Sequence, residues 1–197
     1  MKPRSAEIVA SAAGPEGFPR ADLPEVALLG RSNVGKSSLL NRLVGRQRLA
    51  FASSKPGTTR LLHFYRVERP GRVLLLVDLP GYGWARVSRD ERARWGTLIE
   101  GYLGARPVLR ACVLLQDLRR DLGDDEHDLV AWLAERGLPV VVALTKSDKL
   151  AASPRRRRAE ALAGAFGLPP SRVVATSART GEGTAELWKA IDAVLDA

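Results

Sequence analysis

Short apolar runs alternate along the chain with segments whose apolar residues recur at helical spacing. The runs are rich in Val, Leu and Ala and too short to be helices, which is typical of strands buried on both faces of a sheet. We therefore predict an α/β domain with a mostly parallel sheet and helices on both faces. The predicted parallel strands are residues 26–29, 73–77, 111–115, 140–144 and 172–175.

One further run differs from these. Residues 61–69 mix polar with apolar positions and meet the next strand through the tight pair Pro70-Gly71, which is typical of a hairpin. We predict that this segment pairs antiparallel at or near the sheet edge and brings the sheet to six strands. Ser88 and Glu91 have the spacing of a capping box, so a helix is expected to begin just after Ser88.

Length and composition fit one compact domain. The 197 residues include 45% hydrophobic side chains, enough for a sizeable core. Residues 1–24, with several Gly and Pro, are predicted to be an N-terminal extension packed loosely on a domain that spans residues 25–197. The single cysteine, Cys112, cannot form a disulfide within the chain, and neither a signal peptide nor a bilayer-spanning run is found. We therefore expect a cytoplasmic protein.

The segment GRSNVGKSS at residues 30–38 fits the phosphate-binding pattern GxxxxGK[ST]. It lies between an apolar run and a helical run, so successive backbone N–H groups and a helix N-terminus would face one anion. In such a loop Lys36 reaches the β- and γ-phosphates and Ser37 gives its hydroxyl to Mg²⁺. The loop predicts a site for a polyphosphate, but it does not indicate which nucleotide base is bound.

Three more segments follow predicted strands directly, at the sheet edge where open α/β sheets bind ligands. At Asp78–Gly81 a carboxylate can hold a Mg²⁺-bound water and a glycine N–H can meet the γ-phosphate. In Thr145–Asp148 the aspartate can accept the two N–H donors that guanine has and adenine lacks. Thr176–Ala178 can offer the Ala178 N–H to guanine O6. Together the segments predict a GTP site.

With these motifs the chain resembles the EngB (YihA/YsxC) family of ribosome-biogenesis GTPases, in the TrmE-Era-EngA-EngB-Septin-like superfamily. The resemblance implies a Ras-like P-loop GTPase domain that binds GTP and GDP with Mg²⁺ and hydrolyses GTP slowly. It also implies a role in late assembly of the large (50S) ribosomal subunit and a need for the protein in cell division and septation. The segments that carry the resemblance are LPEVALLGRSNVGKSSLLN at 23–41, SSKPGTTR at 53–60, DLPGYGWARVS at 78–88 and TKSD at 145–148.

The resemblance also assigns roles to individual residues. Lys36, Thr59 and Gly81 are its catalytic candidates. Its magnesium ligands are Ser37, Thr59 and, through a water, Asp78; the neighbouring Thr58 is an alternative to Thr59, because spacing does not separate the two. The nucleotide-binding residues are Gly30, Arg31, Ser32, Asn33, Val34, Gly35, Lys36, Ser37, Ser38, Gly57, Thr58, Thr59, Asp78, Leu79, Pro80, Gly81, Thr145, Lys146, Ser147, Asp148, Thr176, Ser177 and Ala178.

Three positions depart from better-known small GTPases. Tyr82 stands where Ras-like proteins place the glutamine that orients the attacking water, so slow intrinsic hydrolysis is expected. Asn33 matches the position at which related GTPases coordinate K⁺, and we hypothesise potassium-stimulated hydrolysis; the alternative is that Asn33 only tolerates a turn conformation. Thr145 replaces a common asparagine and can brace the loop through its hydroxyl.

The chain is basic, with 31 Lys and Arg against 22 Asp and Glu and a net charge of +9. This surplus favours a polyanionic partner such as rRNA, although an arginine-rich proteome gives the same balance. Arg155–Arg158 follow a predicted helix start, where the dipole disfavours cations, and this favours a role in RNA contact. A second cluster in and after the second switch is interpreted either as an rRNA contact or as a solvated helix face: Arg86, Arg89, Arg92 and Arg94.

We therefore expect the large ribosomal subunit and its rRNA as partners, no stable membrane association and a monomeric protein. One alternative is a GTP-regulated division-site or membrane-associated binding protein without a ribosomal role, although no amphipathic anchor or lipidation motif is found. A second alternative is a GTPase that serves an RNA-modifying enzyme, a class whose members normally carry additional domains.

Overall fold

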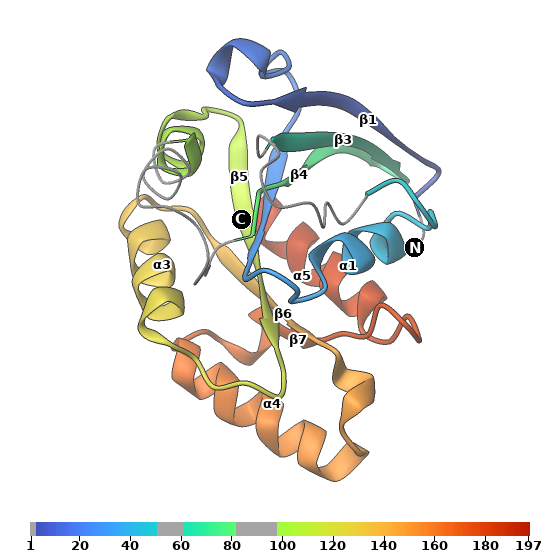
Figure 1. Ribbon diagram of the computed structural model, residues 1–197, viewed down its shortest axis with the longest axis vertical. Coiled ribbons are helices and arrows are strands. Elements are labelled where there is room, and N and C mark those ends of the chain that lie inside the picture. Colours follow the sequence, from blue (N-terminus) through green and yellow to red (C-terminus); the bar gives the residue numbers. More distant parts are fainter. Residues whose placement is uncertain (1–2, 51–60, 82–97) are drawn as a thin grey trace.

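The structure is a computed structural model that describes residues 3–50, 61–81 and 98–197. A seven-stranded sheet forms its middle layer, with strand order β1-β3-β4-β2-β5-β6-β7. Figure 1 shows helices on both sides of this sheet. The strands are β1 (Ser5–Ala12), β2 (Glu25–Gly30), β3 (Leu62–Arg69), β4 (Arg72–Asp78), β5 (Leu109–Asp117), β6 (Val140–Thr145) and β7 (Val173–Ala175).

Two separate apolar clusters form where helices cover the faces of the sheet. On one face α1 and α5 pack against alternate residues of the central strands, such as Leu28 and Val113. On the other face the helical residues 98–105, α3 and α4 pack against their neighbours, such as Leu29 and Leu114. The α/β fold with helices on both faces is therefore confirmed. The helices are α1 (Lys36–Leu43), α3 (Asp124–Glu135), α4 (Ala152–Phe166) and α5 (Thr184–Leu195), with short 3-10 turns at Pro15–Gly17, Ser147–Lys149 and Pro170–Arg172.

The central strands run parallel, as their apolar sequences indicated. Strand β2 pairs with β4 and β5, β5 pairs with β6, and β6 pairs with β7, all in parallel. Strand β3 pairs antiparallel with β4 through the predicted hairpin, from His63 opposite Asp78 to Arg69 opposite Arg72. The carboxyl ends of β2, β4, β6 and β7 consequently lie along one edge of the sheet.

The N-terminal segment corrects two of the sequence-based predictions. Residues expected to pack loosely form β1, which pairs antiparallel with β3 from Ser5 opposite Glu68 to Ala12 opposite Leu62. The sheet thus has seven strands, and β3 is an inner strand with β1 outside it (Figure 1). The alternation of buried and exposed residues in β1 is interrupted by an irregularity between Ile8 and Ala10. This irregularity hides the period of two that identifies a strand in sequence.

A buried ionic network lies at the opposite end of β2 from the phosphate-binding segment. The Glu25 carboxylate is fully buried and accepts a hydrogen bond of 2.8 Å from the Tyr102 hydroxyl. The Arg106 guanidinium contacts both of its oxygens, with a shortest distance of 2.7 Å, and also donates to the carbonyl of Pro19. Burial, followed by the charge of Glu25, raises the pKa of Tyr102 well above its usual value. The network joins residues 19–25 to the helical residues 98–105.

None of the helices within the described ranges combines the length and the apolar character needed to cross a membrane.

Candidate functional site

The loop after β2 has the geometry of an anion cradle. Strand β2 ends at Gly30 and α1 begins at Lys36, so the loop leads directly into a helix N-terminus. In the described part of the chain, the backbone N–H groups of residues 35–38 donate to no protein acceptor. Gly35 has φ of 106°, a left-handed conformation that favours glycine. The free N–H groups and the helix dipole suit a phosphate, as predicted from the sequence.

Two more predicted residues lie against this loop. The Lys36 ammonium pairs with the Asp78 carboxylate at the end of β4, and both side chains are nearly buried. Leu79 is buried in the sheet-facing core, and Gly81 lies beside the loop backbone. A Cβ added at Gly81 would stand 3.0 Å from the Ser32 nitrogen, a closer approach than side chains normally make. The described part of the DLPG segment is therefore held next to the phosphate loop.

The segment after β6 is tied to the same loop by two side chains. Thr145 donates a hydrogen bond of 2.8 Å from its hydroxyl to the Val34 carbonyl, which confirms the bracing role predicted for it. The Lys146 ammonium donates to the Asn33 carbonyl at 2.9 Å. Both Asn33 and Lys146 have left-handed backbones, with φ of 62° and 60°. Such angles are uncommon for residues other than glycine. The left-handed φ of Asn33 therefore supports the alternative that this asparagine is there because it tolerates a turn conformation.

Asp117, at the end of β5, is a site residue that sequence reasoning missed. Its carboxylate lies 3.1 Å from the Lys146 ammonium and accepts two side-chain hydrogen bonds from Arg119, of 2.9 and 2.8 Å. Burial alone would raise the pKa of Asp117, but the hydrogen bonds from Arg119 and Lys146 outweigh it and hold this pKa well below its usual value. Asp117 therefore stays ionised and orients Lys146 across the phosphate loop.

The carboxylate expected to recognise the base lies at the same edge of the sheet. Asp148 is nearly buried and accepts hydrogen bonds from the Ser177 hydroxyl at 2.7 Å and from the Arg179 guanidinium at 2.8 Å. These two bonds, with that of Ser177 the stronger influence, lower the pKa of Asp148 to about 2. Ser147 beside it is fully buried and its backbone N–H donates to the Thr176 carbonyl at 3.1 Å.

The loop after β7 is anchored from several sides. Thr176 and Ser177 are fully buried, and the Thr176 N–H donates to the Leu144 carbonyl at 2.7 Å. The Arg42 guanidinium, from α1, donates to the carbonyls of Ala178 and Arg179 at 2.9 and 2.6 Å. Within the described residues the Ala178 N–H has no protein acceptor. Asp148 is thus hydrogen-bonded to the same loop that carries the Ala178 N–H.

Arg31, predicted as a nucleotide contact, directs its side chain elsewhere. Its guanidinium lies 2.6 Å from a Glu126 oxygen and 3.2 Å from an Asp125 oxygen, both on α3. The second Glu126 oxygen accepts a hydrogen bond of 2.9 Å from the Gly123 N–H, which caps α3. Any contact of Arg31 with nucleotide would therefore come from its backbone, while its side chain fastens the phosphate loop to α3.

The residues present fit a magnesium ion that accompanies a bound nucleotide. Ser37 lies in the first turn of α1 and Asp78 lies beside Lys36, so a hydroxyl and a carboxylate flank the anion cradle. Across the described ranges, no three His, Cys, Asp or Glu side chains gather into a metal-binding group. Mg²⁺ commonly takes few protein ligands and completes its shell with phosphate oxygens and waters, which suits this arrangement. The predicted contacts of Gly57, Thr58, Thr59 and Tyr82 lie outside the described residues.

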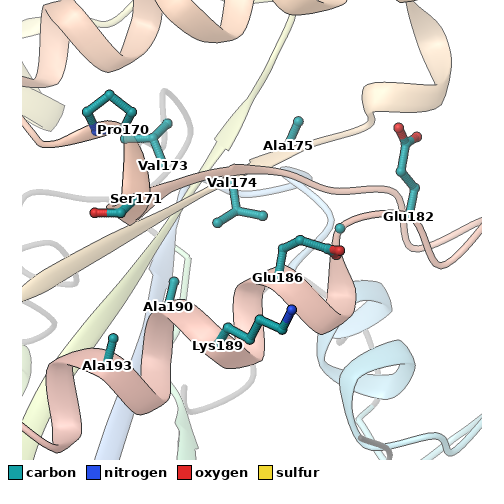
Figure 2. Close-up of a pocket in the computed structure, with 11 residues that line it drawn as sticks. Pro170, Ser171, Val173, Val174, Ala175, Glu182, Glu186, Lys189, Ala190 and Ala193 are labelled. Atoms are coloured by element: carbon teal, nitrogen blue, oxygen red, sulfur yellow. The ribbon is translucent and has the colours of Figure 1, made fainter.

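A second hollow lies apart from the phosphate loop. Figure 2 shows a groove between β7 and α5, with Val174 and Ala190 along its floor and Glu186 and Lys189 at its rim. Its volume is about 660 Å³, and none of the phosphate-loop residues lines it. A much smaller hollow of about 30 Å³ lies between the loop residues 31–34 and the end of β5. The residues predicted to contact the phosphates therefore lie outside the larger groove.

The arginine run at the start of α4 is engaged within the chain. Arg155 pairs with Glu182, Arg156 with Glu160, and Arg158 with Asp121. These partners compensate the unfavourable dipole at the helix start, which explains why the run is tolerated there. Of the four, Arg157 alone lacks a partner in the described part of the chain. The expected RNA contact of this run stays a prediction, as does that of Arg86, Arg89, Arg92 and Arg94, which lie outside the described residues.

The fold and the four motifs at one sheet edge define a P-loop GTPase. A family model described as 50S ribosome-binding GTPase matches residues 25–146. "Probable GTP-binding protein EngB" of Exiguobacterium sp. is 45% identical over 99% of this chain and 98% of its own length. The protein of the same name from Gemmatimonas aurantiaca is 47% identical over 88% of this chain and 83% of its own. The chain therefore belongs to the EngB family of GTP-binding proteins, which confirms the resemblance drawn from its sequence.

Solved structures agree with this assignment at the level of the fold. The crystal structure of a probable GTP-binding protein EngB superposes with a TM-score of 0.69 at 24% identity, covering 87% of this chain and 98% of that one. The G domain of the T. maritima FeoB iron transporter gives a TM-score of 0.58 at 28% identity, covering 87% and 98%.

Proposed function

We propose that this protein is a slow GTPase switch that acts in late assembly of the large (50S) ribosomal subunit in the cytoplasm. The observation that carries the proposal is the single sheet edge at which the phosphate loop, Asp78 and Asp148 meet, in a chain of the EngB family. The description of the matching family model, 50S ribosome-binding GTPase, supports the choice of partner. The basic surplus of +9 supports an rRNA surface.

Guanine would be read by Asp148 and the loop after β7. Its N1–H and N2 amino group are donors for the Asp148 carboxylate, and the free Ala178 N–H suits its O6 acceptor. Adenine has no matching pair of N–H donors for the Asp148 carboxylate, so a bound adenine would lack these hydrogen bonds at a nearly buried group, at a cost of about 1–3 kcal/mol. The cytosolic domain of T. maritima FeoB, 28% identical to this chain and solved in a GMPPNP form, supports a guanine nucleotide in this fold.

The phosphates would be held by the N–H groups of residues 35–38 and by Lys36. Ser37, Thr59 and, through a water, Asp78 would hold magnesium, which would supply positive charge to the phosphates. Lys36 would exchange its partner Asp78 for phosphate oxygens as the nucleotide binds. Thr59 and Gly81 would sense the γ-phosphate, so that hydrolysis releases both segments.

Two details of the reaction belong to this proposal. Slow intrinsic hydrolysis is proposed because Tyr82 replaces the water-orienting glutamine. Stimulation by K⁺ through Asn33 is proposed from its position in the loop, and an equal turnover rate in Na⁺ and K⁺ would refute it. A need for the protein in septation follows from the same family relationship, and we propose that the protein works as a monomer without stable membrane association.

Co-sedimentation with separated ribosomal subunits tests the proposal. The purified protein is mixed with each subunit in the presence of a non-hydrolysable GTP analogue, GDP or no nucleotide, at two salt concentrations. Salt-tolerant binding to the large subunit with the GTP analogue alone is expected. Binding to both subunits in every state, lost as salt rises, would show charge attraction only and contradict the ribosomal role.

A matched variant ties this binding to the nucleotide pocket. Asp148→Asn replaces an acceptor oxygen with an N–H donor, which suits xanthine, because xanthine carries an oxygen where guanine has its amino group. The variant should bind the large subunit with a non-hydrolysable xanthosine analogue and not with the GTP analogue. Flotation with anionic liposomes, expected to be negative, tests the membrane-associated alternative in the same preparations.

A further inference from the structure

Both oxygens of the Asp148 carboxylate are already engaged by side chains of the loop after β7. Ser177 donates to one oxygen at 2.7 Å, and Nε of Arg179 donates to the other at 2.8 Å. The side chains of this ion pair differ sharply in exposure: Arg179 is 69% exposed and Asp148 is 8% exposed. A long exposed side chain therefore reaches inward to a nearly buried acceptor.

The backbone that carries Arg179 is held in place independently of that ion pair. Arg42 donates to the carbonyl oxygens of Ala178 and Arg179, and the Gly181 N–H donates to the Ser177 carbonyl at 2.8 Å. The loop can therefore stay where it is while the Arg179 side chain moves. A substitution that removes the N–H donors of the Arg179 side chain would leave these backbone contacts of the loop in place.

The chemistry of the two possible partners of Asp148 is closely similar. The N1–H, C2 and N2 amino group of guanine form a planar guanidine unit that presents donors only, and the arginine side chain ends in the same unit. A carboxylate accepts such an edge in a planar, often bidentate arrangement. A bidentate guanine would therefore use the Asp148 oxygen to which Arg179 now donates, so Arg179 and guanine compete for the same carboxylate edge.

We propose that Arg179 is an intramolecular competitor of guanine at Asp148, and that release of this ion pair precedes docking of the base. The inference rests on the proposed role of Asp148 in base recognition. Arg179 takes no part in the chemistry: it donates to Asp148 until the base arrives and thereby slows nucleotide association. Once guanine occupies the carboxylate, the competition ends, so the dissociation rate does not depend on the ion pair.

Stopped-flow association of a fluorescent GDP derivative tests the proposal through Arg179→Met. Methionine keeps an apolar stem of similar reach and has no N–H donors. Because partly exposed ion pairs are weak, the association rate constant should rise about two- to fivefold, with an unchanged dissociation rate. Arg156→Met removes an equally charged side chain that is 84% exposed on α4, and should leave both rates unchanged.

The Asp148→Asn background separates this effect from a general effect of charge. Asparagine has no carboxylate for Arg179, so Arg179→Met should not alter the association of fluorescent XDP with the Asp148→Asn protein. An unchanged or slower GDP association in Arg179→Met, or the same acceleration in the Asp148→Asn background, overturns the competition. A failure of Asp148→Asn to prefer XDP over GDP refutes instead the base-recognition role of Asp148, which is a separate result.

Discussion

The hydroxyl of Thr145 donates a 2.8 Å hydrogen bond to the carbonyl oxygen of Val34, which joins the base-recognition segment to the phosphate loop. The same hydroxyl lies 3.3 Å from the Gln116 carbonyl at the end of β5. One buried side chain therefore connects three segments that are distant in sequence and that must agree in position if base and phosphates are to bind together.

We expect Thr145→Val to weaken GDP binding. Valine has nearly the shape of threonine and cannot donate, so the Val34 carbonyl loses its partner, at a cost of about 1–3 kcal/mol. Titration calorimetry should show the affinity falling by about tenfold. Thr145→Ser keeps the hydroxyl and should retain most of the affinity; an equal loss in both variants would assign the effect to packing.

Asp117→Asn should destabilise the protein in a pH-dependent way. The usual aspartate pKa is 3.8 and that of Asp117 in the folded protein is lower, so its ionised form stabilises the fold above about pH 4. This contribution is lost as the pH falls through the folded-state pKa. Urea unfolding should give a deficit of about 1–3 kcal/mol at neutral pH, because its cationic partners are partly exposed.

The deficit of Asp117→Asn should shrink as the pH is lowered from about 4 toward 2. Asp121→Asn serves as the control, since its carboxylate is 90% exposed and pairs with Arg158 on the surface. A deficit that does not change with pH would show that Asp117 acts through its shape and not through its charge.

The thiol of Cys112 should report global unfolding. Burial raises its pKa to about 12, so the reactive thiolate is scarce and shielded while the protein is folded. Labelling of the folded protein by a maleimide should be slow. GDP at a hundred times its dissociation constant stabilises the folded state and should lower the labelling rate by about a further hundredfold. Ser153→Cys, at an exposed position of α4, should label at once. Rapid labelling of Cys112 with saturating GDP would contradict this expectation.

Glu25→Gln should lower stability without altering nucleotide affinity. The substitution leaves the Arg106 charge without its buried partner, which costs about 3–5 kcal/mol. Glu25 begins β2, whereas the phosphate loop follows its other end, so the GDP affinity of the folded protein should stay the same. Glu68→Gln, whose carboxylate is 40% exposed and 3.7 Å from Arg66, should change stability by no more than about 1 kcal/mol.

The nucleotide motifs were predictable because each directly follows a short run of apolar strand residues. Parallel strands bring their carboxyl ends to one edge, so the positions of Asp78 and Asp148 followed from the topology. Asp117 obeys the same rule and was missed, because the predicted strand ended at residue 115. Two buried polar residues, Gln116 and Asp117, extend β5 beyond its apolar stretch, where Gln116 donates to the Arg120 carbonyl in the following turn and Asp117 pairs with Lys146 from another segment.

The remaining differences also arise from contacts between distant segments. Ala6 and Ala12 are the buried side chains of β1, and their small size gives little hydrophobic signal. Arg42 and Arg179 are ordinary surface residues by sequence; Arg42 contacts a loop that is 136 residues away, and Arg179 contacts Asp148, which is 31 residues away. Local sequence patterns identify helices and strands but do not show which of them pack together. Contacts such as these depend on that packing, so the patterns cannot predict them.

The position of β1 in the sheet also determines when this strand can pair during translation. This strand is synthesised first, yet its partner β3 begins at Leu62, and the central strand β2 needs β5, which ends at Asp117. The nascent chain must therefore carry β1 unpaired until more than fifty further residues have been added. Its large apolar side chains are Ile8 and Val9, which also stay exposed in the folded sheet, so the unpaired strand offers other chains these two groups alone until β3 is made.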